Sequence, residues 1–127
     1  MRASHAYDSG YNPAAPVLPI GIGRSGANII RAEVVAFVDT GADATMIPLA
    51  VLRRVGGRPA EQGRVRGILG EPVTVNLYLV AIHIAGYVIH GIRAVALKDN
   101  REPILGRDVL NQLELTLNGP AHESWLA

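Results

Sequence analysis

Apolar and polar residues alternate along much of the chain, and this period of two predicts β-strands. The clearest case is residues 73–79, VTVNLYL, in which every second residue is Val or Leu. Apolar bursts at residues 29–30 and 34–38 are rich in β-branched residues, which favour strands. A hairpin is expected around Ala85-Gly86, with a further strand over residues 92–97. The pattern predicts a mainly β domain.

Two short segments follow the period of a helix instead. In residues 48–57, PLAVLRRVGG, every third residue from Leu49 is apolar, and two glycines provide a stop. The apolar residues after Gly106 suit a second short helix, and a strand is expected over residues 113–117. The sequence therefore predicts one or two short helices beside the sheet.

Composition limits the class of protein. The 127 residues suit one domain, and 49% hydrophobic against 18% charged residues excludes a disordered chain. We expect a flexible N-terminal arm over residues 1–16, a domain over 17–118 and a C-terminal tail over 119–127. No stretch approaches the ~20 apolar residues of a membrane helix, so we expect no membrane partner and a cytoplasmic location.

Charge and side-chain chemistry point to no cofactor. The formal net charge of +1 gives no strong field for nucleic acid. An arginine cluster is expected to be a solvated face rather than a nucleic-acid groove; it consists of Arg53, Arg54, Arg58, Arg64 and Arg66. Cysteine is absent, and the histidines lack metal-ligand spacing, so we expect no metal; they are His5, His83, His90 and His122.

One carboxylate stands out against this background. The apolar run 34–38 delivers Asp39 to the end of a buried strand, and Thr40-Gly41 then turns the chain. An ionised Asp is costly there unless it is paired, hydrogen-bonded or protonated. Asp39 caps a turn, as Asp commonly does before Gly, or it acts as an acid or base with a second carboxyl that shares its proton.

Two more segments accompany Asp39-Thr-Gly-Ala-Asp. Residues 103–112, PILGRDVLNQ, carry an apolar-apolar-Gly step before the second expected helix, and a glycine-bounded turn at 67–70 lies between the two motifs. In this order and spacing, the three resemble the retropepsin-like aspartic proteases, the single-domain retroviral type, over residues 20–118. The resemblance implies a closed β-barrel, the acid protease fold, with one or two short helices and a flap hairpin.

The resemblance also implies an activity and a partner. It implies an aspartic endopeptidase in which each subunit of a homodimer donates one catalytic Asp39, and the dyad activates a water molecule against a protein or peptide substrate. By the same resemblance, the active-site support comprises Thr40, Gly41, Ala42, Asp43 and Arg107. The implied substrate-binding residues are Met46, Ile104 and the flap residues Gly67, Ile68, Leu69 and Gly70.

Other interpretations stay open for several of these residues. Asp43 and Arg107 could form an ordinary surface ion pair, and Met46 and Ile104 could be plain core. The similar Asp8-Ser-Gly lacks a preceding apolar strand and is not expected to be a second half-site. The alternative function is a non-catalytic retropepsin-like dimerisation or peptide-binding module; a generic β-barrel binding protein would need both motifs to be accidental.

Overall fold

Strands dominate the computed structural model, which describes residues 3–66, 70–99 and 101–127. This part of the chain contains ten strands and two short helices. The strands are β1 (Ala3–Ala6), β2 (Val17–Arg24), β3 (Ala32–Val38), β4 (Met46–Pro48), β5 (Arg58–Arg66), β6 (Pro72–Ile84), β7 (Tyr87–Leu97), β8 (Ile104–Leu105), β9 (Leu115–Asn118) and β10 (Glu123–Leu126). The helices are α1 (Leu49–Val55) and α2 (Arg107–Leu110). The mainly β prediction with short helices is confirmed.

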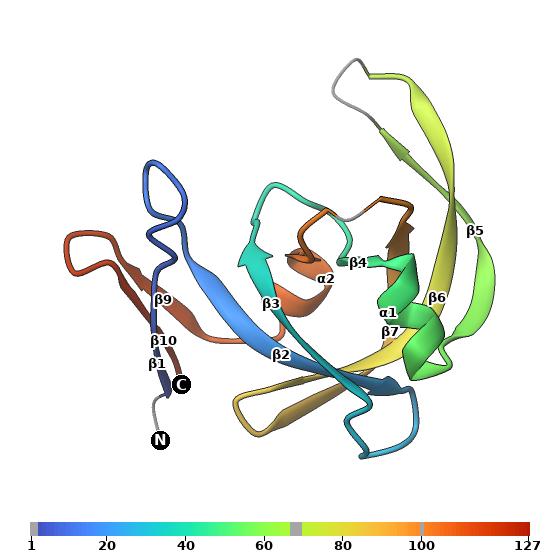
Figure 1. Cartoon of the computed structure of the whole chain (residues 1–127), viewed down its shortest axis with the longest axis horizontal. Helices are drawn as coiled ribbons and strands as arrows, with labels where there is room; N and C mark the ends of the chain where they lie inside the picture. The colour runs from blue at the N-terminus through green and yellow to red at the C-terminus, as the bar shows by residue number, and fades with distance from the viewer. Residues whose placement is uncertain (1–2, 67–69, 100) are drawn as a thin grey trace.

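Seven strands form one curled sheet in the order β2-β3-β8-β4-β7-β6-β5. Strand β2 also pairs with β6, which brings the sheet back onto itself. The long strands β6 and β7 form the expected hairpin, in which Ala85 (φ 47°) and Gly86 (φ 85°) take the positive φ of a tight turn. Figure 1 shows β5 and the outer half of β6 rising away from the rest of the sheet.

The register of this sheet aligns side chains from five strands. Phe37 of β3 is opposite Ile104 of β8, which is opposite Met46 of β4. Met46 is opposite Val95 of β7, and Val95 is opposite Leu77 of β6. Directly paired residues project from the same face of a sheet, so these five side chains form a row across it. We call them the transverse row.

The other face of the sheet holds the core. Val38, Leu105 and Ile47 follow transverse-row residues by one position and are buried, as the alternation of strand side chains requires. The core is aliphatic; among its fully buried members are Leu18, Ile22, Leu52, Ile82 and Val109. Apolar burial of this kind contributes ~25 cal/mol per Å².

Helix α1 follows β4 and ends as the sequence predicts. Its residues Leu52 and Val55 are buried, and Gly56 closes the helix in the left-handed region with φ 72°. The N–H groups of Gly56 and Gly57 donate to the carbonyls of Arg53 and Leu52 at 3.0 Å. None of the helices in the described ranges has the length and apolar content to span a membrane.

The two ends of the chain meet in a separate three-stranded sheet, β1-β10-β9. Ala3 is opposite Leu126 and Ala6 is opposite Glu123, and Figure 1 shows β1 and β10 side by side. The sequence shows no strand pattern at either end, because four-residue segments with mixed polarity carry little periodic signal. The domain limits 17–118 stay a prediction, with β1 and β10 outside them.

Candidate active site

Asp39 lies at the exit of β3, at the start of a loop that runs to β4. Its N–H donates to the carbonyl of Leu105 at 3.1 Å, which fixes the loop to β8. Its half-buried carboxylate accepts one hydrogen bond, from the N–H of Gly41 to Oδ1 at 2.9 Å. Asp39 thus does cap its own turn. A carboxylate can accept several hydrogen bonds, so this cap leaves acceptor sites for other groups.

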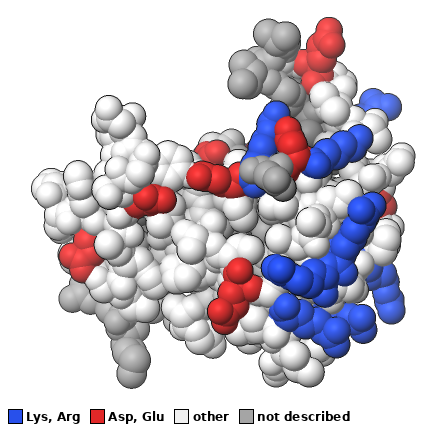
Figure 2. Space-filling model, in the orientation of Figure 1, with Lys and Arg blue, Asp and Glu red and all other residues white. Residues whose placement is uncertain are grey.

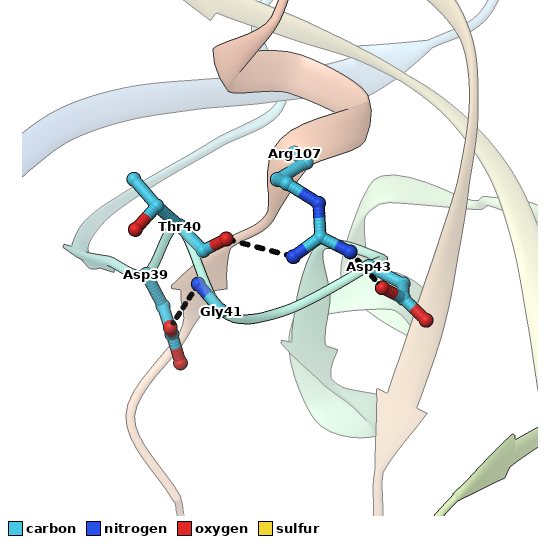
Figure 3. Close-up of polar contacts among 5 residues, drawn as sticks. All are labelled: Asp39, Thr40, Gly41, Asp43 and Arg107. Carbon is cyan, nitrogen blue, oxygen red and sulfur yellow. Dashed lines mark hydrogen bonds and ion pairs between the residues drawn. The ribbon is translucent and has the colours of Figure 1, made fainter.

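Arg107, the first residue of α2, holds this loop from the helix side (Figure 3). Its Nη1 donates to the carbonyl of Thr40 at 2.7 Å, and its Nη2 donates to Oδ1 of Asp43. Its backbone N–H donates to the carbonyl of Ala42 at 2.9 Å. The planar guanidinium suits such a forked contact, and the expected contact between Asp43 and Arg107 is present. Its role in catalysis stays a prediction.

Gly106 permits the close packing of α2 on the loop. A Cβ atom at this position would lie 2.5 Å from the carbonyl carbon of Ala44, a distance that real side chains do not adopt. The backbone of the loop and the start of α2 therefore approach more closely than any other residue would allow. This close packing is the physical reason why a glycine follows the two apolar residues of the motif.

A second connection, between Thr45 and Asp108, was not anticipated from the sequence. Thr45 is fully buried; its hydroxyl donates to Oδ1 of Asp108 at 2.7 Å, and its N–H donates to Oδ2 at 3.1 Å. The same hydroxyl accepts the N–H of Gly106 at 3.1 Å. Asp108 also accepts the N–H of Val109 at 2.9 Å. Two features of the sequence could have indicated this contact: a Thr within an apolar run and an Asp in the first turn of a helix.

The expected substrate-binding residues fall in two places. Met46 and Ile104 are half-buried neighbours in the transverse row, which places them on the open face of the sheet. Gly67, Ile68 and Leu69 lie outside the described residues. Gly70 is described, with φ 79°, a backbone conformation that favours glycine.

A groove of about 570 Å³ lies between the Asp39 loop and the inner side of β5, β6 and β7. Asp43 and Ala44 line one side of it, while Leu77 and Val95 of the transverse row lie on the other. The groove is mostly apolar apart from charged residues such as Arg93, which forms an ion pair with Glu61. A groove with an apolar surface and a few polar groups is typical of ligand sites.

Basic side chains gather away from the terminal sheet. Figure 2 shows Lys and Arg concentrated over the side of the molecule where Figure 1 places α1 and β5. Arg53 and Arg54 are exposed in the last turn of α1, and Arg58 and Arg64 are exposed on β5. Their exposure agrees with a solvated face, and the absence of a nucleic-acid partner stays a prediction.

Comparisons with known proteins agree on one family. A family model described as "gag-polyprotein putative aspartyl protease" matches residues 26–112. EIAV protease complexed with the inhibitor HBY-793 is similar in structure, with a TM-score of 0.60, 26% identity, and 77% of this chain and 86% of that one covered. A retropepsin-like aspartic protease from Rickettsia conorii matches in fold at a TM-score of 0.70 and 14% identity, over 99% of this chain and 89% of that one. A comparison with curated protein sequences gives no match. The architecture is the acid protease fold, and the chain belongs to the retropepsin-like aspartic protease family.

Proposed function

We propose that the chain is an aspartic endopeptidase that acts as a homodimer, with one Asp39 from each subunit at a shared site. The observation that carries this proposal is the Asp39 carboxylate. It lies half-buried on a loop that Arg107 and Asp108 hold to the helix, and one hydrogen bond from its own turn leaves acceptor sites available. The family membership supports peptide hydrolysis as its chemistry.

The chemistry needs two carboxyl groups in different protonation states. Two carboxylates at ~3 Å cannot both ionise, so a pair would hold one proton between them. The ionised member takes a proton from water as the oxygen attacks the scissile carbonyl carbon, and the protonated member donates to the carbonyl oxygen. The tetrahedral intermediate then breaks its C–N bond as the amine leaving group receives a proton. No covalent acyl-enzyme forms.

A second copy of the chain is the natural source of the second carboxyl. Thr40 is exposed beside Asp39, so its hydroxyl is accessible to a partner subunit. The similar Asp8 caps a turn of its own, accepting the N–H of Gly10 at 2.8 Å. The groove lined by Asp43 would then receive one half of an extended peptide.

Asp39→Asn tests the catalytic role. The amide keeps the size of the side chain and can still accept the Gly41 N–H, so folding should survive while peptide cleavage falls by a factor of ~10³ or more. Asp8→Asn is the matched control, because Asp8 has the same cap geometry with Gly10, and it should cleave at the parent rate. Equal cleavage by the Asp39→Asn variant and the parent would refute the proposal.

Dilution tests the shared site. Specific activity should fall as the concentration drops below the dimer dissociation constant, in step with the monomer fraction measured by sedimentation. Constant activity per mole in a solution of monomers would contradict the dyad.

The alternative, a non-catalytic peptide-binding module, is decided by a different result. Binding of a pepstatin-type inhibitor without cleavage of any member of a peptide library would favour the module.

A further inference from the structure

Five exposed arginines on β2, α1 and β5 take no part in the proposed chemistry. Arg24 is the last residue of β2, and its Nη2 lies 2.6 Å from the point where a Cβ of Gly56 would be. It is therefore close to the two arginines in the last turn of α1 and to the one at the start of β5. Figure 2 shows the basic side chains gathered on this side of the molecule. We call these five residues the arginine patch; they are Arg24, Arg53, Arg54, Arg58 and Arg64.

The arginine patch lacks internal partners. None of its guanidinium groups forms a hydrogen bond or an ion pair with another described residue, whereas Arg93, Arg101 and Arg107 each pair with a carboxylate. The C-terminal end of a helix favours basic residues, which accounts for Arg53 and Arg54 but not for the other three. Positive charges gathered without carboxylates repel one another, so the patch favours an anion from outside the chain.

The arginine patch also continues the groove beside the Asp39 loop. Arg64 belongs to the patch and lines the groove as well. Arg58 precedes it by six residues on β5, so the patch extends at most about 20 Å along this strand, at about 3.3 Å per residue. About six residues of an extended peptide cover that length. A polypeptide that leaves the groove past Arg64 would therefore lie along the patch.

We propose that the arginine patch binds an acidic segment of the protein substrate, outside the segment that the groove holds. The proposal rests on the endopeptidase function and names its substrate class: proteins with a run of Asp or Glu at some distance from the scissile bond. The planar guanidinium suits this role, because it binds a carboxylate through two parallel hydrogen bonds. Each subunit of the proposed homodimer has one patch, so an acidic run on either side of the bond should bind.

A nucleic acid is the other polyanion to consider. Proteins that hold single strands combine positive charge with aromatic side chains on which the bases stack. Neither α1 (LAVLRRV) nor β5 (RPAEQGRVR) contains an aromatic residue. The formal net charge of +1 also gives little attraction for a long phosphate backbone. An acidic polypeptide therefore fits the arginine patch better.

Peptides that differ only in a tail test the inference. Both contain one cleavage site, chosen from a peptide library digested by the parent protein, and a Gly-Ser linker of varied length joins it to about four Glu or four Gln residues. At low ionic strength, kcat/KM for the Glu-tailed peptide should be about 10-fold higher, mainly through a lower KM, because several exposed ion pairs each contribute a small factor. The preference should disappear in about 0.5 M NaCl, which screens exposed charges.

Variants assign this preference to the arginine patch. Arg53→Gln/Arg54→Gln should lower it to about 2-fold or less and still cleave the Gln-tailed peptide at the parent rate. Arg53→Lys/Arg54→Lys is the matched control at the same positions; it keeps the charge and should keep most of the preference. Thr116→Glu/Ala121→Glu changes the net charge equally at exposed positions in or beside β9, which Figure 1 places far from α1, and should also keep it.

Binding to the Asp39→Asn variant separates this inference from the proposed function. In fluorescence anisotropy, the variant should bind the labelled Glu-tailed peptide about 10-fold more tightly than the Gln-tailed one, without any cleavage. Equal kcat/KM and equal Kd for the two tails would overturn the inference and leave the endopeptidase proposal intact. If labelled single-stranded DNA bound in that case, the patch would be a nucleic-acid site. Undiminished cleavage by Asp39→Asn would instead remove the endopeptidase proposal.

Discussion

Thr45→Val isolates the connection between the Asp39 loop and α2. Valine has nearly the shape of threonine, so the fully buried site stays filled while the hydroxyl is removed. The Oγ1 bond to Asp108, 2.7 Å long, is lost, and the N–H of Gly106 loses its acceptor at 3.1 Å. The N–H of Thr45 still donates to Asp108, so the change removes two defined hydrogen bonds.

The expected loss of stability follows from these two bonds. A hydrogen bond to a charged group contributes ~1.5–3 kcal/mol, and a buried N–H left without a partner costs ~1–3 kcal/mol. Because the Val side chain recovers some apolar contact, we expect a net loss of about 3 kcal/mol in the free energy of unfolding. With a urea slope of ~1.5 kcal/mol/M, the midpoint should fall by about 2 M.

Urea unfolding at pH 7 and one protein concentration measures this loss. Thr74→Val is the control, because Thr74 is exposed on β6 and such a change should stay within ~0.5 kcal/mol. Thr45→Ser keeps the hydroxyl and should lose only about 1 kcal/mol for the missing methyl group. A midpoint for Thr45→Val equal to that of the control would refute the reasoning, since the two hydrogen bonds would then contribute nothing.

Three other changes test the loop, a helix end and the terminal sheet. Arg107→Lys keeps the charge but loses the forked contact of the guanidinium with Thr40 and Asp43. We expect kcat/KM to fall at least ~10-fold and the free energy of unfolding to change by under ~1 kcal/mol; an unchanged kcat/KM would contradict this prediction. Gly56→Ala should cost ~1 kcal/mol for its φ of 72°, about as much as Gly26→Ala at φ 87°, because the Arg24 guanidinium 2.6 Å from the Gly56 Cβ position ends a flexible side chain and can move aside; no loss of stability in urea unfolding of Gly56→Ala would contradict this. A hydrogen bond from the Ser4 hydroxyl lowers the pKa of Glu123 below its ordinary 4.5. In urea unfolding, the parent should therefore be more stable than Glu123→Gln at pH 7, and this difference should disappear as the pH falls below 4.5. The same difference at pH 3 as at pH 7 would contradict the prediction.

Local patterns predicted the elements and the motifs. The alternation in residues 73–79 became part of β6, and the paired glycines after residue 55 end α1 as expected. These features depend on neighbours in sequence, which is why periodicity finds them. Periodicity was misleading for the apolar pair Ile29 and Ile30, which the sequence favours as part of a strand. The pair precedes β3, and its residues are 61% and 46% exposed.

Contacts between distant segments could not be predicted in this way. Thr45 and Asp108 are 63 residues apart, and Ser4 and Glu123 are 119 apart. No periodicity within either segment specifies its partner, since the contact arises only when the whole sheet is assembled. The contact between the rings of Tyr11 and Phe37 is of the same kind, because it joins a loop without any periodic pattern to a distant strand.

The pairing of β1 with β10 has a consequence for biosynthesis. The first strand of the chain finds its partner only after Glu123–Leu126 has been made. At translation rates of ~5–20 residues per second, β1 therefore remains for on the order of ten seconds without the backbone hydrogen bonds that it forms with β10. The β1–β10 pairing therefore forms only after the residues between the two strands have been synthesised, and a polypeptide that stops before Glu123 would lack the strand that pairs with β1.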